Sequence, residues 1–91
     1  MTVPQPIEAP FKGITLTWEQ DGPVPVIRAF SVLQALEMTR NEFDFIVYDE
    51  GLDTPVWHIP TGVVYFEYDT LYDVLTVIPG AEALREHMYG F

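Results

Sequence analysis

Residues 63–78 read VVYFEYDTLYDVLTVI and carry the two patterns that decide the fold. Within 63–68, aromatic and β-branched residues alternate between two faces, which predicts a half-buried strand. Thr70 and Asp73 then have the spacing of a capping box, which predicts a helix over 71–78. The β-branched residues of 71–78 keep a further strand open as the alternative.

Upstream of this stretch, the sequence predicts two short strands and a helix. Residues 13–20 alternate between apolar and polar side chains, as a half-buried strand does. Residues 24–27 predict a second short strand, which the neighbouring prolines confine to an edge of the sheet. Ser31 and Gln34 form another capping box, so we expect a helix to begin at Ser31. Met38 falls on the outer side of this helix and is a candidate exposed apolar contact.

Residues 43–48 are rich in aromatic and β-branched residues, and we expect them to form a strand. Residues 56–59 predict a brief strand, followed by a turn over 60–62. Residues 81–89 have apolar positions at helical spacing and predict a last helix. Because the connections between strands are short, antiparallel pairing is favoured. The expected fold class is therefore α+β, with a small antiparallel sheet of three to four strands and two to three helices packed on it.

The chain has 91 residues, the length of one small domain. Residues 1–12 contain three prolines, at Pro4, Pro6 and Pro10, which predicts an extended N-terminal arm. We expect residues 13–91 to form a single acidic α+β domain. Hydrophobic residues make up 48% of the chain and aromatic residues 14%, a composition that supplies a core and excludes a disordered chain.

Charge is the most unusual property of the sequence. Fourteen acidic residues face four basic ones, for a net charge of −10, and residues 41–84 contain no lysine or arginine. Such a surface repels phosphate backbones and anionic lipid head groups, so direct binding to nucleic acid or membranes is not expected. The sequence shows no membrane-spanning stretch and no signal-peptide pattern at residues 1–6, so we expect a soluble, cytoplasmic protein.

No metal or cofactor site is expected. The chain lacks cysteine, and its two histidines, His58 and His87, lie far apart in sequence, so no short-spaced zinc motif is present. Residues 49–53 look superficially like the start of a calcium loop. However, Gly51 comes too early for that loop, and no suitable glutamate follows it.

The sequence is equally poor in catalytic groups, and no enzyme activity is expected. Ser31 is the only serine, and its predicted role is a helix cap. The six glycines are scattered and match no phosphate-binding loop. Carboxylates are abundant, but in a chain this acidic most of them solvate the surface.

Tyrosine and tryptophan residues interrupt the acidic stretches. These residue types are common at interface hot spots because they combine a large contact area with a polar group. Beside carboxylates they suit a partner that presents arginine and lysine. The predicted partner-binding residues are Asp44, Tyr48, Asp49, Glu50, Asp53, Trp57, Tyr65, Glu67 and Asp69. The alternative is that the aromatic residues fill the core and the acids only solvate the surface.

Two functions from different classes fit these observations. The first is a non-enzymatic, acidic protein-binding inhibitor, a nucleic-acid mimic that occupies the basic nucleic-acid-binding surface of a target protein or complex. In size, acidity and lack of catalytic motifs, such a chain resembles phage-encoded anti-restriction and anti-CRISPR factors. The second is a structural or assembly module, either a homodimer or a subunit of a larger complex.

Overall fold

The sheet has four strands, all paired antiparallel, as the short connections predicted. The computed structural model describes residues 10–20, 23–58 and 62–90. The strands are β1 (Glu19–Gln20), β2 (Pro25–Arg28), β3 (Val56–His58) and β4 (Val64–Glu67), in the spatial order β1-β2-β4-β3. β2 and β4 therefore form the centre of the sheet, and β1 and β3 form its edges.

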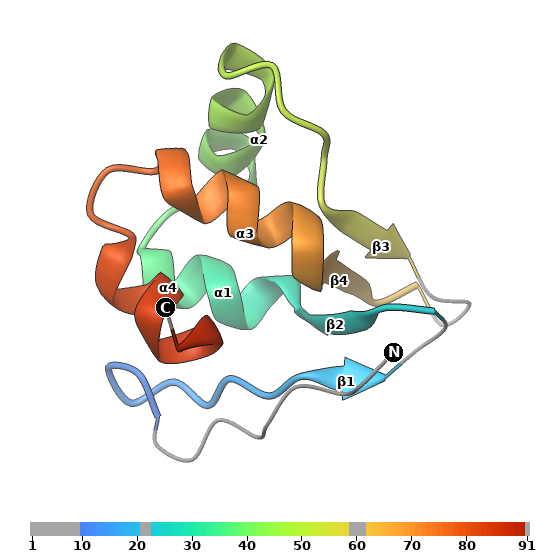
Figure 1. The fold of residues 1–91 in the computed structure, drawn as a ribbon, viewed down its shortest axis with the longest axis vertical. Coiled ribbons are helices and arrows are strands. Elements are labelled where there is room, and N and C mark those ends of the chain that lie inside the picture. The colour runs from blue at the N-terminus through green and yellow to red at the C-terminus, as the bar shows by residue number, and fades with distance from the viewer. Residues whose placement is uncertain (1–9, 21–22, 59–61, 91) are drawn as a thin grey trace.

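The described part of the chain contains four helices, where the sequence predicted two to three. They are α1 (Ala29–Leu36), α2 (Arg40–Asp49), α3 (Tyr68–Val77) and α4 (Glu82–Tyr89). α1 and α3 both pack against β2 and β4, and α4 packs against α3. Figure 1 shows α2 at one end of the molecule, away from β1 and α4. The α+β class expected from the sequence is confirmed.

The core lies where these helices meet the sheet. Ile27 of β2 and Phe66 of β4 are register partners, and both are fully buried. Phe66 stacks on Phe43 of α2, with ring centroids 4.7 Å apart and planes 14° from parallel. Burial of such apolar area is the main force that holds a chain of this size together.

α2 is a helix where a strand was predicted over 43–48, so that prediction is wrong. Thr39 accepts a hydrogen bond from the Glu42 amide at 3.2 Å, and the Glu42 carboxylate accepts one from the Thr39 amide at 2.9 Å. This capping box satisfies two backbone donors and starts the helix before the β-rich residues are reached. Phe43 and Val47, four residues apart, then share the buried face. Burial of this pair outweighs a strand propensity that depends strongly on context.

α1 and α3 begin earlier than their predicted caps. α1 starts directly after Arg28, so Ser31 lies inside its first turn instead of capping it. α3 starts directly after Glu67, which leaves Thr70 inside the helix and shortens the strand predicted over 63–68. In both places a strand runs straight into a helix. Glu67 has the extended backbone of an N-cap position, whereas Arg28 has φ −56° and ψ 123°, and neither side chain makes a capping hydrogen bond.

The alternation predicted over 13–20 is present in the burial pattern, although only β1 joins the sheet. Leu16 and Trp18 are buried, while the intervening Thr17 is exposed. The indole nitrogen of Trp18 donates a hydrogen bond to the backbone oxygen of Met88 at 3.2 Å. Side-chain packing, more than a strand ladder, therefore ties this segment to the helices.

β2 is a central strand, so the expectation that prolines confine it to an edge is wrong. It pairs with β1 on one side and with β4 on the other. Pro25 is the first residue of the strand, and its register partner Gln20 is the last residue of β1. A proline is tolerated at the first position of a strand, because few ladder hydrogen bonds depend on its missing amide.

The second half of the 63–78 stretch is a helix, as predicted, and the alternative strand does not form. Leu71 and Val74 are fully buried on its inner face. The chain then turns at Gly80, whose φ of 81° favours a residue without a side chain. α4 follows, with Leu84 and Met88 facing inward as its spacing predicted.

Three predictions fall wholly or partly outside the described residues. They are the extended arm over 1–12, of which residues 1–9 are not described, the turn over 60–62, and the end of the strand predicted over 56–59. β3 confirms the strand from Val56 to His58.

Candidate protein-binding surface

The outer face of α2 exposes two aromatic side chains. Phe45 is 67% exposed and Tyr48 is 86% exposed, although the opposite face of the same helix is buried in the core. Residues three apart on a helix occupy neighbouring positions, so the two rings form one patch. Exposed apolar side chains that are grouped, unlike those scattered singly, are typical of a binding surface.

Carboxylates surround this aromatic pair. Glu42 precedes Phe45 by three residues, Asp49 follows it by four, and both are exposed beside it on the helix. Glu50 is exposed directly after α2. Hydrogen bonds to the backbone and the side chain of Thr39 hold the pKa of Glu42 below its ordinary value of 4.5. This carboxylate is therefore negative at neutral pH. We call Glu42, Phe45, Tyr48, Asp49 and Glu50 the α2 face.

Asp44 was predicted to bind a partner, but it is not part of the α2 face. It is only half-exposed, and the Nε atom of Arg40 donates to both of its carboxylate oxygens at 3.1 Å. This pair, four residues apart, balances the charge of Asp44 within the helix. Asp49 and Glu50 take part in neither of the two ion pairs found among the described residues.

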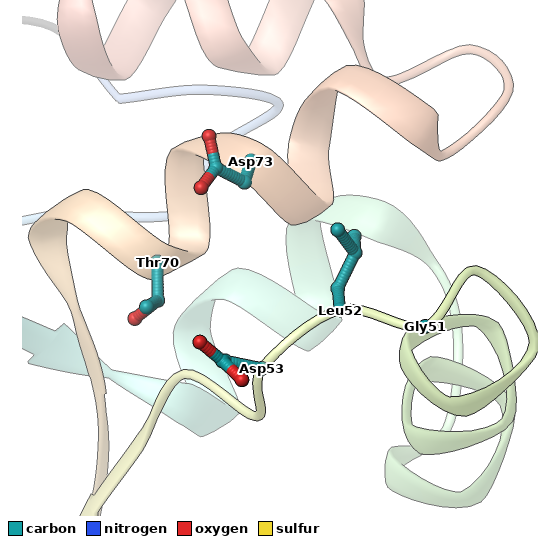
Figure 2. Close-up of a pocket in the computed structure, with 5 residues that line it drawn as sticks. All are labelled: Gly51, Leu52, Asp53, Thr70 and Asp73. Atoms are coloured by element: carbon teal, nitrogen blue, oxygen red, sulfur yellow. The ribbon is translucent and has the colours of Figure 1, made fainter.

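A small acidic cavity lies where the loop after α2 passes α3. It encloses about 170 Å³ and is lined by Gly51, Leu52, Asp53, Thr70 and Asp73. Figure 2 shows Asp53 on the loop and Thr70 on α3 at opposite sides of it. The hydroxyl oxygen of Thr70 is buried without a hydrogen-bond partner. The acidic surface therefore extends from Asp53, in the loop after α2, to Asp73 of α3, which is distant in sequence.

A second cavity continues this surface along α3. Asp73 lines both cavities, and Asp69 lines the second one together with three tyrosines of α3 and α4. Of the acids predicted to bind a partner, Asp49, Glu50, Asp53 and Asp69 therefore lie along the end of α2, its loop and the adjoining part of α3.

Two of the predicted residues, Tyr65 and Glu67, do not join this surface. Tyr65 is only 5% exposed, and its hydroxyl donates to a carboxylate oxygen of Glu19 at 3.3 Å. Glu67 is half-buried at the end of β4, where its amide donates to the backbone oxygen of Pro55. The side chain of Trp57 lies outside the described residues; its backbone pairs with Tyr65 in the sheet.

Sequence reasoning missed three members of the surface: Glu42, Phe45 and Asp73. Phe45 was placed on one face with Phe43 and Val47, because residues 43–48 were predicted to form a strand. The capping pair Thr39 and Glu42 was the available signal, because it starts a helix that turns Phe45 outward. Asp73 was taken as a capping residue, and only the three-dimensional fold brings it opposite Asp53.

The histidines and carboxylates form no metal centre in the part of the chain that the structure describes. No group of three or more histidine, aspartate or glutamate side chains there is arranged to hold a metal ion. His87 packs its ring against Phe11, with ring centroids 5.4 Å apart. No described helix has both the length and the apolar composition needed to cross a membrane.

Comparison with protein-family models, with curated proteins and with solved structures finds no match for this chain. A function can therefore be inferred only from the surface itself.

Proposed function

We propose that this chain is a non-enzymatic, protein-binding inhibitor that occupies the basic nucleic-acid-binding surface of a partner protein. The observation that carries the proposal is the α2 face, where Phe45 and Tyr48 stand exposed among carboxylates. An exposed aromatic pair has no role in the core of this fold. Carboxylates around it select a partner of opposite charge.

The surplus of negative charge supports a partner that ordinarily binds phosphate. The net charge is −10, and the two described ion pairs, Lys12 with Glu37 and Arg40 with Asp44, neutralise only two carboxylates. Lysine and arginine side chains that contact a nucleic-acid backbone are equally suited to carboxylates. A surface of this kind therefore competes with nucleic acid for the same side chains.

The mechanism has two steps. The acidic field first speeds the encounter with a basic surface, an effect that weakens as salt screens the charges. Tyr48 and Phe45 then dock into the partner and slow dissociation, because buried aromatic anchors contribute most of the binding energy at interfaces.

The test is affinity capture followed by competition. The wild-type chain, a Phe45→Ala/Tyr48→Ala variant and a Glu82→Gln/Glu86→Gln control are immobilised and exposed to nuclease-treated lysate of the native host. The control removes two exposed acids from α4, away from the α2 face. We expect a basic protein to be retained by the wild type and the control, and to bind the aromatic variant about tenfold or more weakly.

The captured protein is then purified and bound to labelled nucleic acid. We expect the wild-type chain to displace the nucleic acid, with an affinity that falls as salt is raised. Simultaneous binding of chain and nucleic acid, or capture that does not depend on the aromatic pair, would contradict the proposal.

A homodimer or a fixed place in a larger assembly is the second candidate, and one observation favours it. A groove of about 530 Å³ lies between α1 and α2. It is lined by Phe30, which is 69% exposed, and by the half-buried Leu33 and Met38. Sedimentation at micromolar concentration tests this candidate. A dimer that a Phe30→Ser variant disrupts would favour assembly, whereas a monomer favours the inhibitor.

A further inference from the structure

The second cavity, between α3 and α4, has an unusual lining. It is an open hollow of about 300 Å³, lined by Tyr68, Asp69, Tyr72, Asp73 and Tyr89. The four α3 residues are spaced at i, i+1, i+4 and i+5, which places them on adjoining positions of one helix face. Tyr89, at the end of α4, closes the other side. Three aromatic rings and two carboxylates therefore face the same small space.

The three tyrosine rings that line the cavity pack against one another and against Trp18. The ring of Tyr89 lies 4.8 Å from the ring of Tyr68 and 5.1 Å from the ring of Tyr72, measured between centroids. Trp18 packs behind them, 4.8 Å from Tyr68 and 5.3 Å from Tyr89. The Tyr89 hydroxyl also donates to the Tyr68 backbone oxygen at 2.6 Å. A site built on packed rings loses little freedom when it binds a ligand.

The two carboxylates make the cavity negative. Asp69 and Asp73 are exposed, and neither takes part in an ion pair within the described ranges. Burial, followed by the nearby Tyr68, Asp69 and Asp73, raises the pKa of Tyr89. The potential of both aspartates therefore reaches the inner wall of the cavity. The two carboxylates outnumber the one cation nearby, the guanidinium of Arg85 over the Tyr72 ring, so an anion is disfavoured there and a cation is favoured.

Among organic cations, a guanidinium group suits this lining best. The faces of tyrosine rings attract cations, and a planar guanidinium stacks on them. Its N–H donors need acceptors, which the two carboxylates supply. The chain already shows one such contact, because the guanidinium carbon of Arg85 lies 6.0 Å from the centre of the Tyr72 ring. A quaternary ammonium group uses the rings but has no donors for the carboxylates.

We propose that the cavity formed by Tyr68, Tyr72 and Tyr89, with Asp69 and Asp73 at its rim, receives the side chain of an arginine on the basic partner. This inference rests on the proposed function, which supplies a partner rich in arginine and lysine. It adds a second docking point to the α2 face and specifies the chemistry of the group that enters it.

The experiment uses a small probe and does not need the partner. N-acetyl-L-arginine amide is titrated into the isotopically labelled chain while backbone amide shifts are recorded, with the uncharged N-acetyl-L-citrulline amide as the matched ligand control. We expect saturable shifts centred on Asp69, Tyr72 and Tyr89 in the low-millimolar range, as a few cation–π and charged hydrogen bonds allow. The citrulline probe should produce none at the same concentrations.

A pair of variants locates the site. Asp69→Asn/Asp73→Asn should weaken arginine binding about fivefold or more, whereas Glu82→Gln/Glu86→Gln, which removes the same charge from α4, should leave it unchanged. Thermal melts of both variants confirm that the fold is retained. Equal shifts with citrulline, shifts spread over all acidic residues, or tighter binding of tetramethylammonium than of the arginine probe would overturn the inference.

The two proposals fail in different ways. If the arginine probe does not bind but the α2 face still captures a nucleic-acid-binding protein, only the cavity inference is wrong. If the probe binds but no captured protein competes with nucleic acid, the cavity stands and the proposed function is wrong.

Discussion

The α2 face and the tyrosine cluster, formed by Tyr68 and Tyr72 of α3 and Tyr89 of α4, both combine aromatic rings with carboxylates. The rings are exposed in the first and packed together in the second. On α2, Phe45 and Tyr48 are 67% and 86% exposed and are surrounded by carboxylates. On α3 and α4, Tyr68 and Tyr89 pack on each other and on Trp18, and their acids stand at the rim. The first arrangement leaves aromatic area for a partner, while the second uses it to hold the fold and to shape a cavity.

This difference distinguishes aromatic rings that stabilise the fold from aromatic rings that do not. Aromatic residues of the tyrosine cluster lose contacts within the chain when they are removed, so their variants should unfold more easily. Aromatic residues of the α2 face have few such contacts to lose, so their variants should stay folded and lose only binding. The following variants test that separation.

The largest expected effect belongs to Trp18→Ala. Trp18 is 6% exposed, packs against two tyrosine rings and donates its indole hydrogen bond to Met88, so its removal should lower the free energy of unfolding by about 3–5 kcal/mol. Phe45→Ala, which removes a comparable ring from the α2 face, should change it by less than about 0.5 kcal/mol. Urea denaturation followed by circular dichroism measures both. Equal losses would abolish the distinction between the two regions.

Tyr89→Phe tests the contribution of the Tyr89 hydroxyl while leaving its ring in the tyrosine cluster. It removes the 2.6 Å hydrogen bond to the Tyr68 backbone oxygen and leaves a half-buried acceptor behind, at a cost of about 1 kcal/mol. Tyr48→Phe is the matched control, because Tyr48 is 86% exposed and should change stability negligibly. Thermal melts of the two variants, compared with the wild type, give the answer. A Tyr89→Phe protein as stable as the wild type would show that this bond contributes nothing net.

Thr39→Ala tests whether the capping box starts α2 at Arg40 and so places Phe45 and Tyr48 on its outer face. It removes the side-chain half of the capping box with Glu42, which should cost about 1 kcal/mol and fray the start of α2. Ser31→Ala is the control, since Ser31 lies inside the first turn of α1 instead of at its cap, and alanine suits a helix interior. Hydrogen exchange of the α2 amides should rise only in the first variant. Faster exchange in both variants would count against the observed helix start.

The smallest expected effect is a pH dependence at Glu42. Hydrogen bonds from Thr39 lower its pKa in the folded state below 4.5, so the charged form is favoured by folding. The resulting stability is present above the unfolded pKa and is lost as pH falls through the folded one. The melting-temperature difference between wild type and Glu42→Gln, which keeps the side-chain acceptor, should therefore be larger at neutral pH than well below pH 4.5. A difference that grows on acidification would contradict the sign.

The sequence predicted those parts of the fold where local pattern and tertiary packing agree. The alternation of β4, the helix after it and the inward face of α4 all combine a clear period with a clear break at Pro79 and Gly80. The class α+β and the antiparallel pairing followed from these elements and from the short connections between them.

The prediction failed where two local signals competed. The β-rich residues of 43–48 indicated a strand, while the cap at Thr39 and Glu42 indicated a helix, and packing of Phe43 on Phe66 decides for the helix. Because of this error, Phe45 was left out of the predicted binding residues. The acids after α2 were found from sequence because acidity is visible in composition, but the meeting of Asp53 with Asp73 depends on folding and has no local signature.

Titration of the labelled chain with an oligoarginine peptide, followed by backbone amide shifts, shows whether a basic ligand binds at the α2 face and the adjoining acids or at every acidic residue. Glu82 and Glu86 of α4 are exposed acids without an exposed aromatic pair beside them, and they serve as the internal comparison. We expect the shifts to concentrate on α2 from Phe45 onward, on the loop through Asp53 and on the adjoining part of α3. Shifts of equal size at Glu82 and Glu86 would show that the acids act only as a diffuse charge, and would contradict this expectation.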